Sequence, residues 1–261
     1  MMIERNSSAL LEIAPKNFMA LHLFIIAFLN FSIIGCSVNL DGDETMTSAY
    51  FTGKLAELEV AVRADDPASI AAAIASGADV NGRGEHMVTP LIIAVDRLKA
   101  TAVAELLAQG ADPNLRADDG ASAVSLAVDN YRAAPEIMEQ IFEAGGNPNT
   151  LRPNNNPVIM RFVHDRNCER LRYMKSIGAD LDVRTRADDP IITDAAVAQD
   201  WDIVWCLIEL NARYDYETTA RSPISRSLSR GFPAPDSPIY PYKVKVWEFL
   251  KSHGIAVPPL D

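Results

Sequence analysis

The sequence predicts an all-α protein made of about six consecutive helix-turn-helix units separated by loops. Three observations predict this fold class. Strings of the Gly-Ala-Asp type recur every 33 to 35 residues, and a second set of strings recurs in phase with them. Apolar residues make up 48% of the 261 residues, which is enough for a substantial core, whereas 23% charged residues are too few for a wholly disordered chain.

The first element of the chain is an apolar run that lies outside the repeats. It extends over 17 residues, from Phe18 to Ile34, and is shorter than the roughly 20 apolar residues of a membrane-spanning helix. This length suits the core of a signal peptide. The quartet Ile33-Ile34-Gly35-Cys36 at its end resembles the bacterial lipobox. The resemblance implies cleavage before Cys36 and attachment of lipid to it.

We therefore expect residues 1–35 to be a lipoprotein signal peptide and residues 36–49 to be the acylated cysteine with a flexible tether. Ser37, in place of Asp, resembles the pattern of lipoproteins that move to the outer membrane. The expected location is the periplasmic side of that membrane. The alternative is an uncleaved anchor helix with an incidental cysteine.

The recurring strings mark helix ends. One set ends each second helix with glycine, the residue that adopts left-handed backbone at least cost. Its copies are GADVN at 77–81, GADPN at 110–114, GGNPN at 145–149, GADLD at 178–182 and NARYD at 211–215. The other set begins each first helix with a side chain that accepts a hydrogen bond from a free amide, usually followed by proline. These caps are Thr89, Ser122, Asn156, Asp189 and Ser222.

Each second helix carries an apolar pair four and seven residues before its glycine, as Val103 and Leu106 stand before Gly110. This spacing puts both side chains on one buried helix face. The whole pattern resembles the ankyrin repeat, whose signature T-P-L-H-x-A stands here as Thr89-Pro90-Leu91-Ile92-Ile93-Ala94. The resemblance covers residues 50–258 and implies an ankyrin-repeat solenoid whose hairpin loops project to one side. The family's His in the fourth position is absent.

One position departs from the family, which expects a small residue five places after each cap. Arg161 and Asp194 occupy it in adjacent units. Because neighbouring helices lie about 8–10 Å apart, we expect an ion pair between these two side chains. The alternative is that Arg161 turns to water and belongs to a binding surface.

The chain has only three cysteines, which excludes a disulfide framework. In repeat phase, Cys168 and Cys206 stand about five residues apart in height on neighbouring second helices. With the lateral spacing of helices, the expected Cα separation exceeds about 10 Å, beyond the limit for a disulfide. We therefore expect two free thiols.

Charge and motifs argue against several functions. The net charge of −11 opposes general nucleic-acid binding, which needs basic patches. Four histidines leave little for a metal site, and the sequence has neither a phosphate-binding glycine loop nor an HExxH motif. We expect no enzyme activity, no catalytic residues, no cofactor and no metal.

Two regions are candidate contacts for a protein partner. One is a row of arginines in the expected hairpin tips, which suit bidentate carboxylate contacts: Arg83, Arg116, Arg152 and Arg184. The ankyrin consensus, which favours a basic residue there, explains the row equally. The other is the proline-rich insertion at 231–242, with Phe232 and Tyr240, which either binds a partner or covers the last helix pair.

The expected function is that of a membrane-tethered periplasmic ankyrin-repeat protein that binds an unidentified protein. One role that the resemblance suggests is an immunity protein that neutralises a secreted toxic effector. The alternative is a scaffold or stress-defence accessory protein held by an uncleaved N-terminal membrane helix.

Overall fold

The structure is a computed structural model that describes residues 50–216, 224–230 and 233–259. The chain divides into two units, Met1–Thr45 and Met46–Asp261, and every described residue belongs to the second. The predicted signal peptide and tether, with Cys36, lie outside the described residues, as does Phe232. Within the described part the fold is all-helical and has no named strand, which confirms the predicted all-α class.

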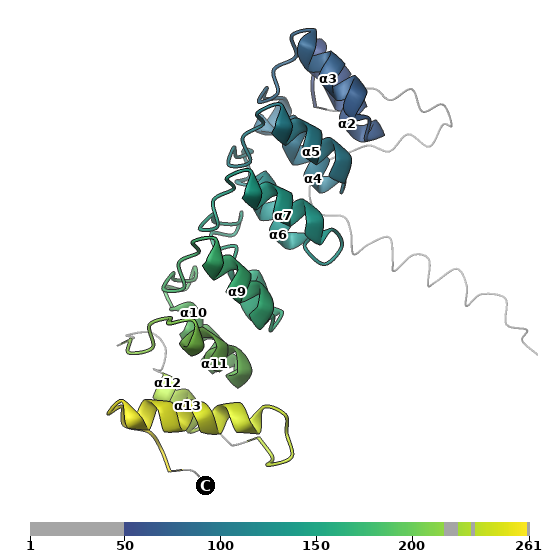
Figure 1. Ribbon diagram of the computed structural model, residues 1–261. Helices are drawn as coiled ribbons and strands as arrows, with labels where there is room; N and C mark the ends of the chain where they lie inside the picture. The colour runs from purple at the N-terminus through teal and green to yellow at the C-terminus, as the bar shows by residue number, and fades with distance from the viewer. Residues whose placement is uncertain (1–49, 217–223, 231–232, 260–261) are drawn as a thin grey trace, which may run out of the picture. The chain divides into compact units, whose positions relative to one another are not determined.

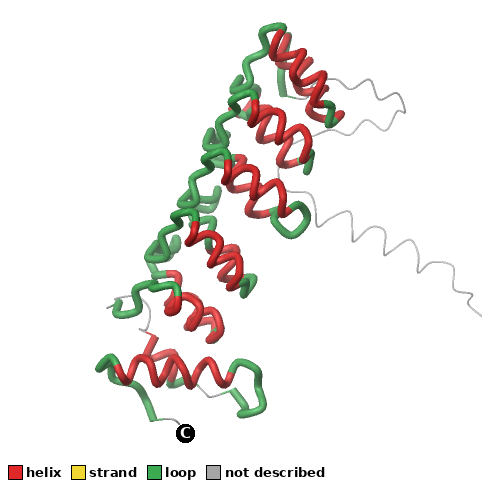
Figure 2. Tube along the Cα trace, in the orientation of Figure 1, coloured by secondary structure: helices red, strands yellow, loops and turns green. Residues whose placement is uncertain are grey.

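The α-helices of the described residues follow one another in six pairs (Figure 1). A short turn joins the helices of each of the first five pairs, and the longer proline-rich segment joins those of the sixth. We number the pairs in chain order: α2 (Lys54–Ala64) with α3 (Pro67–Ala75), α4 (Pro90–Asp96) with α5 (Ala100–Ala108), α6 (Ala123–Asp129) with α7 (Pro135–Glu143), α8 (Met160–His164) with α9 (Cys168–Ser176), α10 (Ile191–Ala198) with α11 (Trp201–Glu209), and α12 (Ile224–Leu228) with α13 (Tyr240–Ser252). A 3₁₀ turn, η1, spans Glu85–Met87. Longer loops connect one pair to the next and lie along one edge of the stacked pairs (Figure 2).

Two predicted helix caps are present. Thr89 Oγ1 accepts a hydrogen bond from the Ile92 amide at 3.2 Å. Ser122 and Ser125 form a reciprocal capping box at the start of α6, with both side chains buried. These bonds satisfy amides that the first turn of a helix leaves free.

Two other predicted caps are wrong. α8 begins only at Met160, and Asn156 Oδ1 instead accepts from the Arg186 amide in the next loop at 2.8 Å. α10 begins at Ile191, after Pro190, without a side-chain cap bond. The fifth predicted cap, Ser222, lies outside the described residues.

Backbone conformation, and not lack of space, selects glycine at the ends of the second helices. Gly110 and Gly178 have φ of 88° and 92°, and a Cβ added at either would meet no atom within 4 Å. Asn211 takes the same place with φ of 61°, as expected for the residue that tolerates left-handed backbone best after glycine.

The predicted apolar pairs form the centre of the core. Val103 and Leu106 of α5 are fully buried, as are the corresponding residues of α9 and α11. In the last pair the pattern shifts by one residue, because Val246 is buried while Trp247 is only partly covered and donates to the Pro258 carbonyl at 2.6 Å.

The asparagines that end the first three strings of the Gly-Ala-Asp type tie successive loops together. Asn114 Nδ2 donates to the Gly145 carbonyl at 3.1 Å, and its Oδ1 accepts from the Asn147 amide at 2.8 Å. Asn81 and Asn149 make the same two bonds to the loops that follow them. Each asparagine therefore satisfies backbone groups of the next string and fixes the spacing between loops.

We expect Asn114→Ala to lower the free energy of unfolding by about 1–2 kcal/mol, because it removes both bonds to the next loop. Asn114→Asp keeps the acceptor, as Asp182 does naturally towards the Arg213 amide, and should cost less. Urea denaturation measures both changes. Asn130→Ala is the control, since the Asn130 side chain makes no hydrogen bond within the described residues. An equal loss in the control would contradict the role of the ladder.

Candidate protein-binding surface

The predicted arginine row is engaged within the protein. Arg83 Nη1 donates to the Arg116 carbonyl at 2.9 Å, and Arg116 Nη2 donates to the Leu151 carbonyl in the next loop. Both side chains are exposed at the loop edge. They therefore brace successive loops and present only part of each guanidinium to a partner.

The other two arginines of the row differ from this pattern. Arg184 Nη1 donates to the Asp188 carbonyl of its own loop at 2.6 Å, and its guanidinium lies 5.7 Å from the centre of the Tyr216 ring. Arg152 turns away from the loop tips, and its Nη2 lies 2.5 Å from Asp129 Oδ1 at the end of α6. With only 20% of its side chain exposed, Arg152 belongs to a different set of residues.

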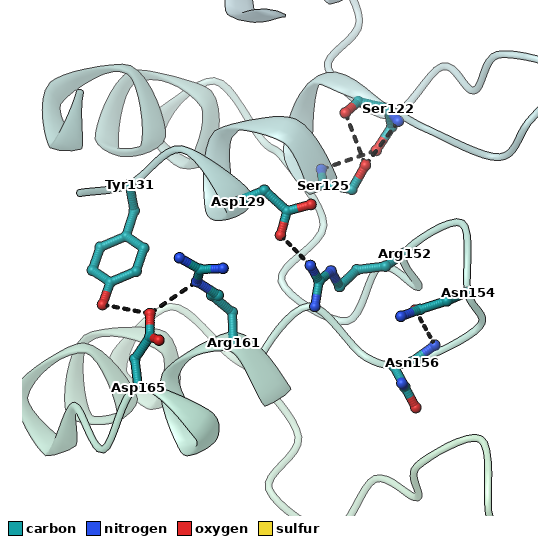
Figure 3. Close-up of polar contacts among 9 residues, drawn as sticks. All are labelled: Ser122, Ser125, Asp129, Tyr131, Arg152, Asn154, Asn156, Arg161 and Asp165. Carbon is teal, nitrogen blue, oxygen red and sulfur yellow. Dashed lines mark hydrogen bonds and ion pairs between the residues drawn. The ribbon is translucent and has the colours of Figure 1, made fainter. Parts of the chain in front are cut away.

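That set is a polar cluster between the third and fourth helix pairs, and Figure 3 shows all of its residues except Arg132. We call it the α6–α8 cluster; it comprises Asp129, Tyr131, Arg132, Arg152, Arg161 and Asp165. Asp165, at the end of α8, accepts from Tyr131 Oη at 3.0 Å. The same carboxylate lies 2.8 Å from Arg161 Nε and 3.1 Å from Arg132 Nη2.

The predicted ion pair between Arg161 and Asp194 is wrong. Arg161 pairs with Asp165, four residues along the same helix, and its guanidinium lies 5.9 Å from the centre of the Tyr131 ring. Asp194 faces His164, with Oδ2 and Nε2 3.4 Å apart. Residues four apart on one helix are neighbours on its surface, so Asp165 lies within reach of Arg161.

The α6–α8 cluster contains one more positive than negative side chain. Burial raises the pKa of Asp129, although the charges of Arg152 and Arg161 oppose that rise. Three guanidinium groups face two carboxylates, which leaves one net positive charge. Arg152 Nε also has no hydrogen-bond partner within the described part of the chain.

A hollow of about 310 Å³ lies next to the cluster, on the other side of α8. Met160 and Ala187 give it apolar surface, while Arg186 and the His164–Asp194 pair give it charge. The bond from the Arg186 amide to Asn156 holds the loop beside the helix. The remaining lining residues are Asn156 and Thr185.

The prediction of two free thiols is also wrong. Cys168 and Cys206 form a disulfide with a Cα separation of 5.9 Å. The prediction assumed that equal places in the repeat lie at equal heights. In the structure Cys168, the first residue of α9, instead meets Cys206, the sixth residue of α11. The Arg172–Glu209 ion pair, at 3.0 Å, joins the same two helices with a similar offset.

The sequence analysis missed Tyr131, Asp129 and Asp165. Two residues of the cluster stood out in the sequence: Arg161 as a charged residue at a position expected to be small, and Arg152 as a member of the arginine row. Tyr240 lies partly buried at the start of α13, which is compatible with either of its predicted roles.

Among the described residues, no group of three or more His, Cys, Asp or Glu side chains could hold a metal ion. No helix in that part of the chain combines the length and hydropathy needed to cross a membrane. No family model matches the chain, and a search of curated proteins finds no match.

We expect Arg152→Ala to destabilise the protein by about 1–3 kcal/mol at pH 7, because it leaves the Asp129 carboxylate without its closest partner. The raised pKa of Asp129 should rise further in this variant. A carboxyl group whose pKa is higher in the folded than in the unfolded state favours folding only at low pH. The loss should therefore grow as the pH rises above about 4.

Unfolding measured at several pH values tests this expectation. Adding Asp129→Asn to Arg152→Ala should remove the extra dependence on pH. If the loss in Arg152→Ala is the same at pH 4 and pH 7, Asp129 is not the group that titrates.

Proposed function

We propose that this chain is a membrane-tethered ankyrin-repeat protein of the bacterial periplasm that binds another protein. The observation that carries the proposal is the agreement between the repeat of 33 to 35 residues and the succession of helix pairs. The asparagine bonds between loops add support, because they recur with the same period. A stack of this kind presents an extended surface made of successive loops and first helices.

The Cys168–Cys206 disulfide supports a location outside the cytoplasm, because structural disulfides persist in oxidising compartments. The lipobox-like quartet ending at Cys36 supports attachment by acyl chains. We therefore place the protein on the periplasmic side of the outer membrane. The alternative, an uncleaved N-terminal helix, would place it at the inner membrane.

The partner surface that we propose comprises the α6–α8 cluster, the hollow beside α8 and the exposed loop arginines Arg83, Arg116 and Arg184. Its positive groups stand on a chain of net charge −11, so they favour an acidic patch on the partner. One role of such a protein is immunity against a secreted toxic effector. A scaffold or stress-defence accessory is the second candidate, favoured if the N-terminal helix is retained. We assign the protein no catalytic role and no cofactor.

Cys36→Ser should abolish incorporation of labelled palmitate and leave the precursor uncleaved, because the lipid is attached to that sulfur. Ser37→Ala is the matched control and should keep the label. Metabolic labelling and mass measurement of the purified chain provide the readout. Label that persists in Cys36→Ser would refute lipid attachment at Cys36, and absence of label from the wild type would favour the uncleaved anchor.

Arg186→Glu should weaken capture of the partner at least tenfold while leaving the unfolding free energy within about 0.5 kcal/mol of the wild type. Its side chain makes no ion pair or hydrogen bond within the described residues, so the change acts on the surface alone. Arg97→Glu is the control, because Arg97 is exposed at the turn between α4 and α5, away from the loops.

Quantitative capture from periplasmic extract compares the three proteins. The partner is the protein that Arg97→Glu retains and Arg186→Glu loses. If both variants retain the same set of proteins, the hollow beside α8 is not part of the binding surface.

A further inference from the structure

A second hollow lies on the side of the stack formed by the second helices, away from the loops. It has a volume of about 350 Å³, within the range of small ligand pockets. Its lining comes from the turn before α9, which contributes Arg166, and from α9, α11 and α13, which follow one another along the stack (Figure 1). We call it the outer pocket, and none of the surfaces described above includes it.

The walls of the outer pocket are held in place by contacts between these three helices. The Cys168–Cys206 disulfide lines the pocket and joins α9 to α11. The Trp205 ring, also in the wall, packs edge-on against Phe249 of α13, with ring centres 6.1 Å apart. A pocket fixed in this way does not have to be ordered when a ligand enters, which lowers the free-energy cost of binding.

The two arginines that line the pocket already have carboxylate partners. Arg166 Nη2 lies 2.8 Å from Asp202 Oδ2, and Arg172 Nη2 lies 3.0 Å from Glu209 Oε2. The other oxygen of Glu209 accepts from Trp205 Nε1 at 2.6 Å. The charges within these two ion pairs cancel, and their side chains form the rim of the pocket.

Lys245 is the cation that remains. Within the described residues it has no carboxylate partner, and its Nζ lies 5.6 Å from the centre of the Trp205 ring and 5.4 Å from that of Tyr242. The charged side chains that line the pocket therefore carry one net positive charge. The two rings stabilise the ammonium only in part, and its N–H donors are free for an acceptor.

We propose that the outer pocket binds an acidic side chain of a protein partner. The carboxylate meets Lys245 Nζ, and the apolar residues beside it pack on Trp205 and Tyr242. This site is separate from the loop surface of the proposed function, so either can fail without the other. Tyr242 is the last residue of the proline-rich insertion at 231–242. From the sequence, this insertion either binds a partner or covers the last helix pair, and the proposed site gives Tyr242 a role in binding.

A pair of isosteric peptides tests the proposal on the full chain, kept in detergent micelles if it carries lipid. The probes are acetyl-Leu-Glu-Leu-amide and acetyl-Leu-Gln-Leu-amide, which differ only in the charge. The readout is the indole N–H signal of Trp205 in a nitrogen–proton correlation spectrum, assigned with Trp205→Phe. We expect the Glu peptide to shift this signal in a saturable way and the Gln peptide to bind at least fivefold more weakly.

Lys245→Gln should weaken binding of the Glu peptide at least fivefold. Lys251→Gln is the matched control, because Lys251 lies on the same helix, 4.5 Å from the Trp247 ring centre, and does not line the pocket. It should leave the affinity within twofold of the wild type. Equal binding of the two peptides, no saturable shift, or an equal loss in the two lysine variants would each overturn the proposal.

Discussion

No helix pair in this protein can bury its apolar face alone, and the rest of the structure follows from that constraint. Val103 and Leu106 of α5 are fully buried because a pair stacks on either side of them. Each pair is therefore stabilised by its contacts with the neighbouring pairs, and the stability of the stack depends on every interface between neighbours. Any feature that alters one interface acts on the pairs at both sides of it.

The interfaces are not alike, and the differences coincide with the candidate sites. The first three pairs approach through small residues such as Ala94 and Ala127, both fully buried. Between the third and fourth pairs, Arg161 takes the place of the alanine and brings a polar cluster with it. The fourth and fifth pairs are joined covalently through Cys168. The regular positions of the repeat pack the helices together, and positions that depart from the repeat hold the polar cluster and the disulfide.

Local signals in the sequence were sufficient for the helix pairs, the glycine ends and the caps at Thr89 and Ser122, because each depends on a few neighbouring residues. The Cys168–Cys206 disulfide could not be predicted, because it depends on how α9 and α11 pack against each other, which no local pattern encodes. Arg161 was identified from the sequence as an unusual position, but its predicted partner was wrong, because the Asp165 carboxylate lies nearer. The loop arginines were found, but their acceptors are backbone carbonyls, which carry no residue signature.

The disulfide also has a mechanical consequence. Its two cysteines are 38 residues apart in sequence, so the chain between them cannot be extended by a force applied to the two ends of the protein. That segment would otherwise contribute roughly 130 Å of extended length. When the stack is pulled from its ends, the segment between the two cysteines therefore stays closed as a loop, whatever the order in which the helix pairs unfold.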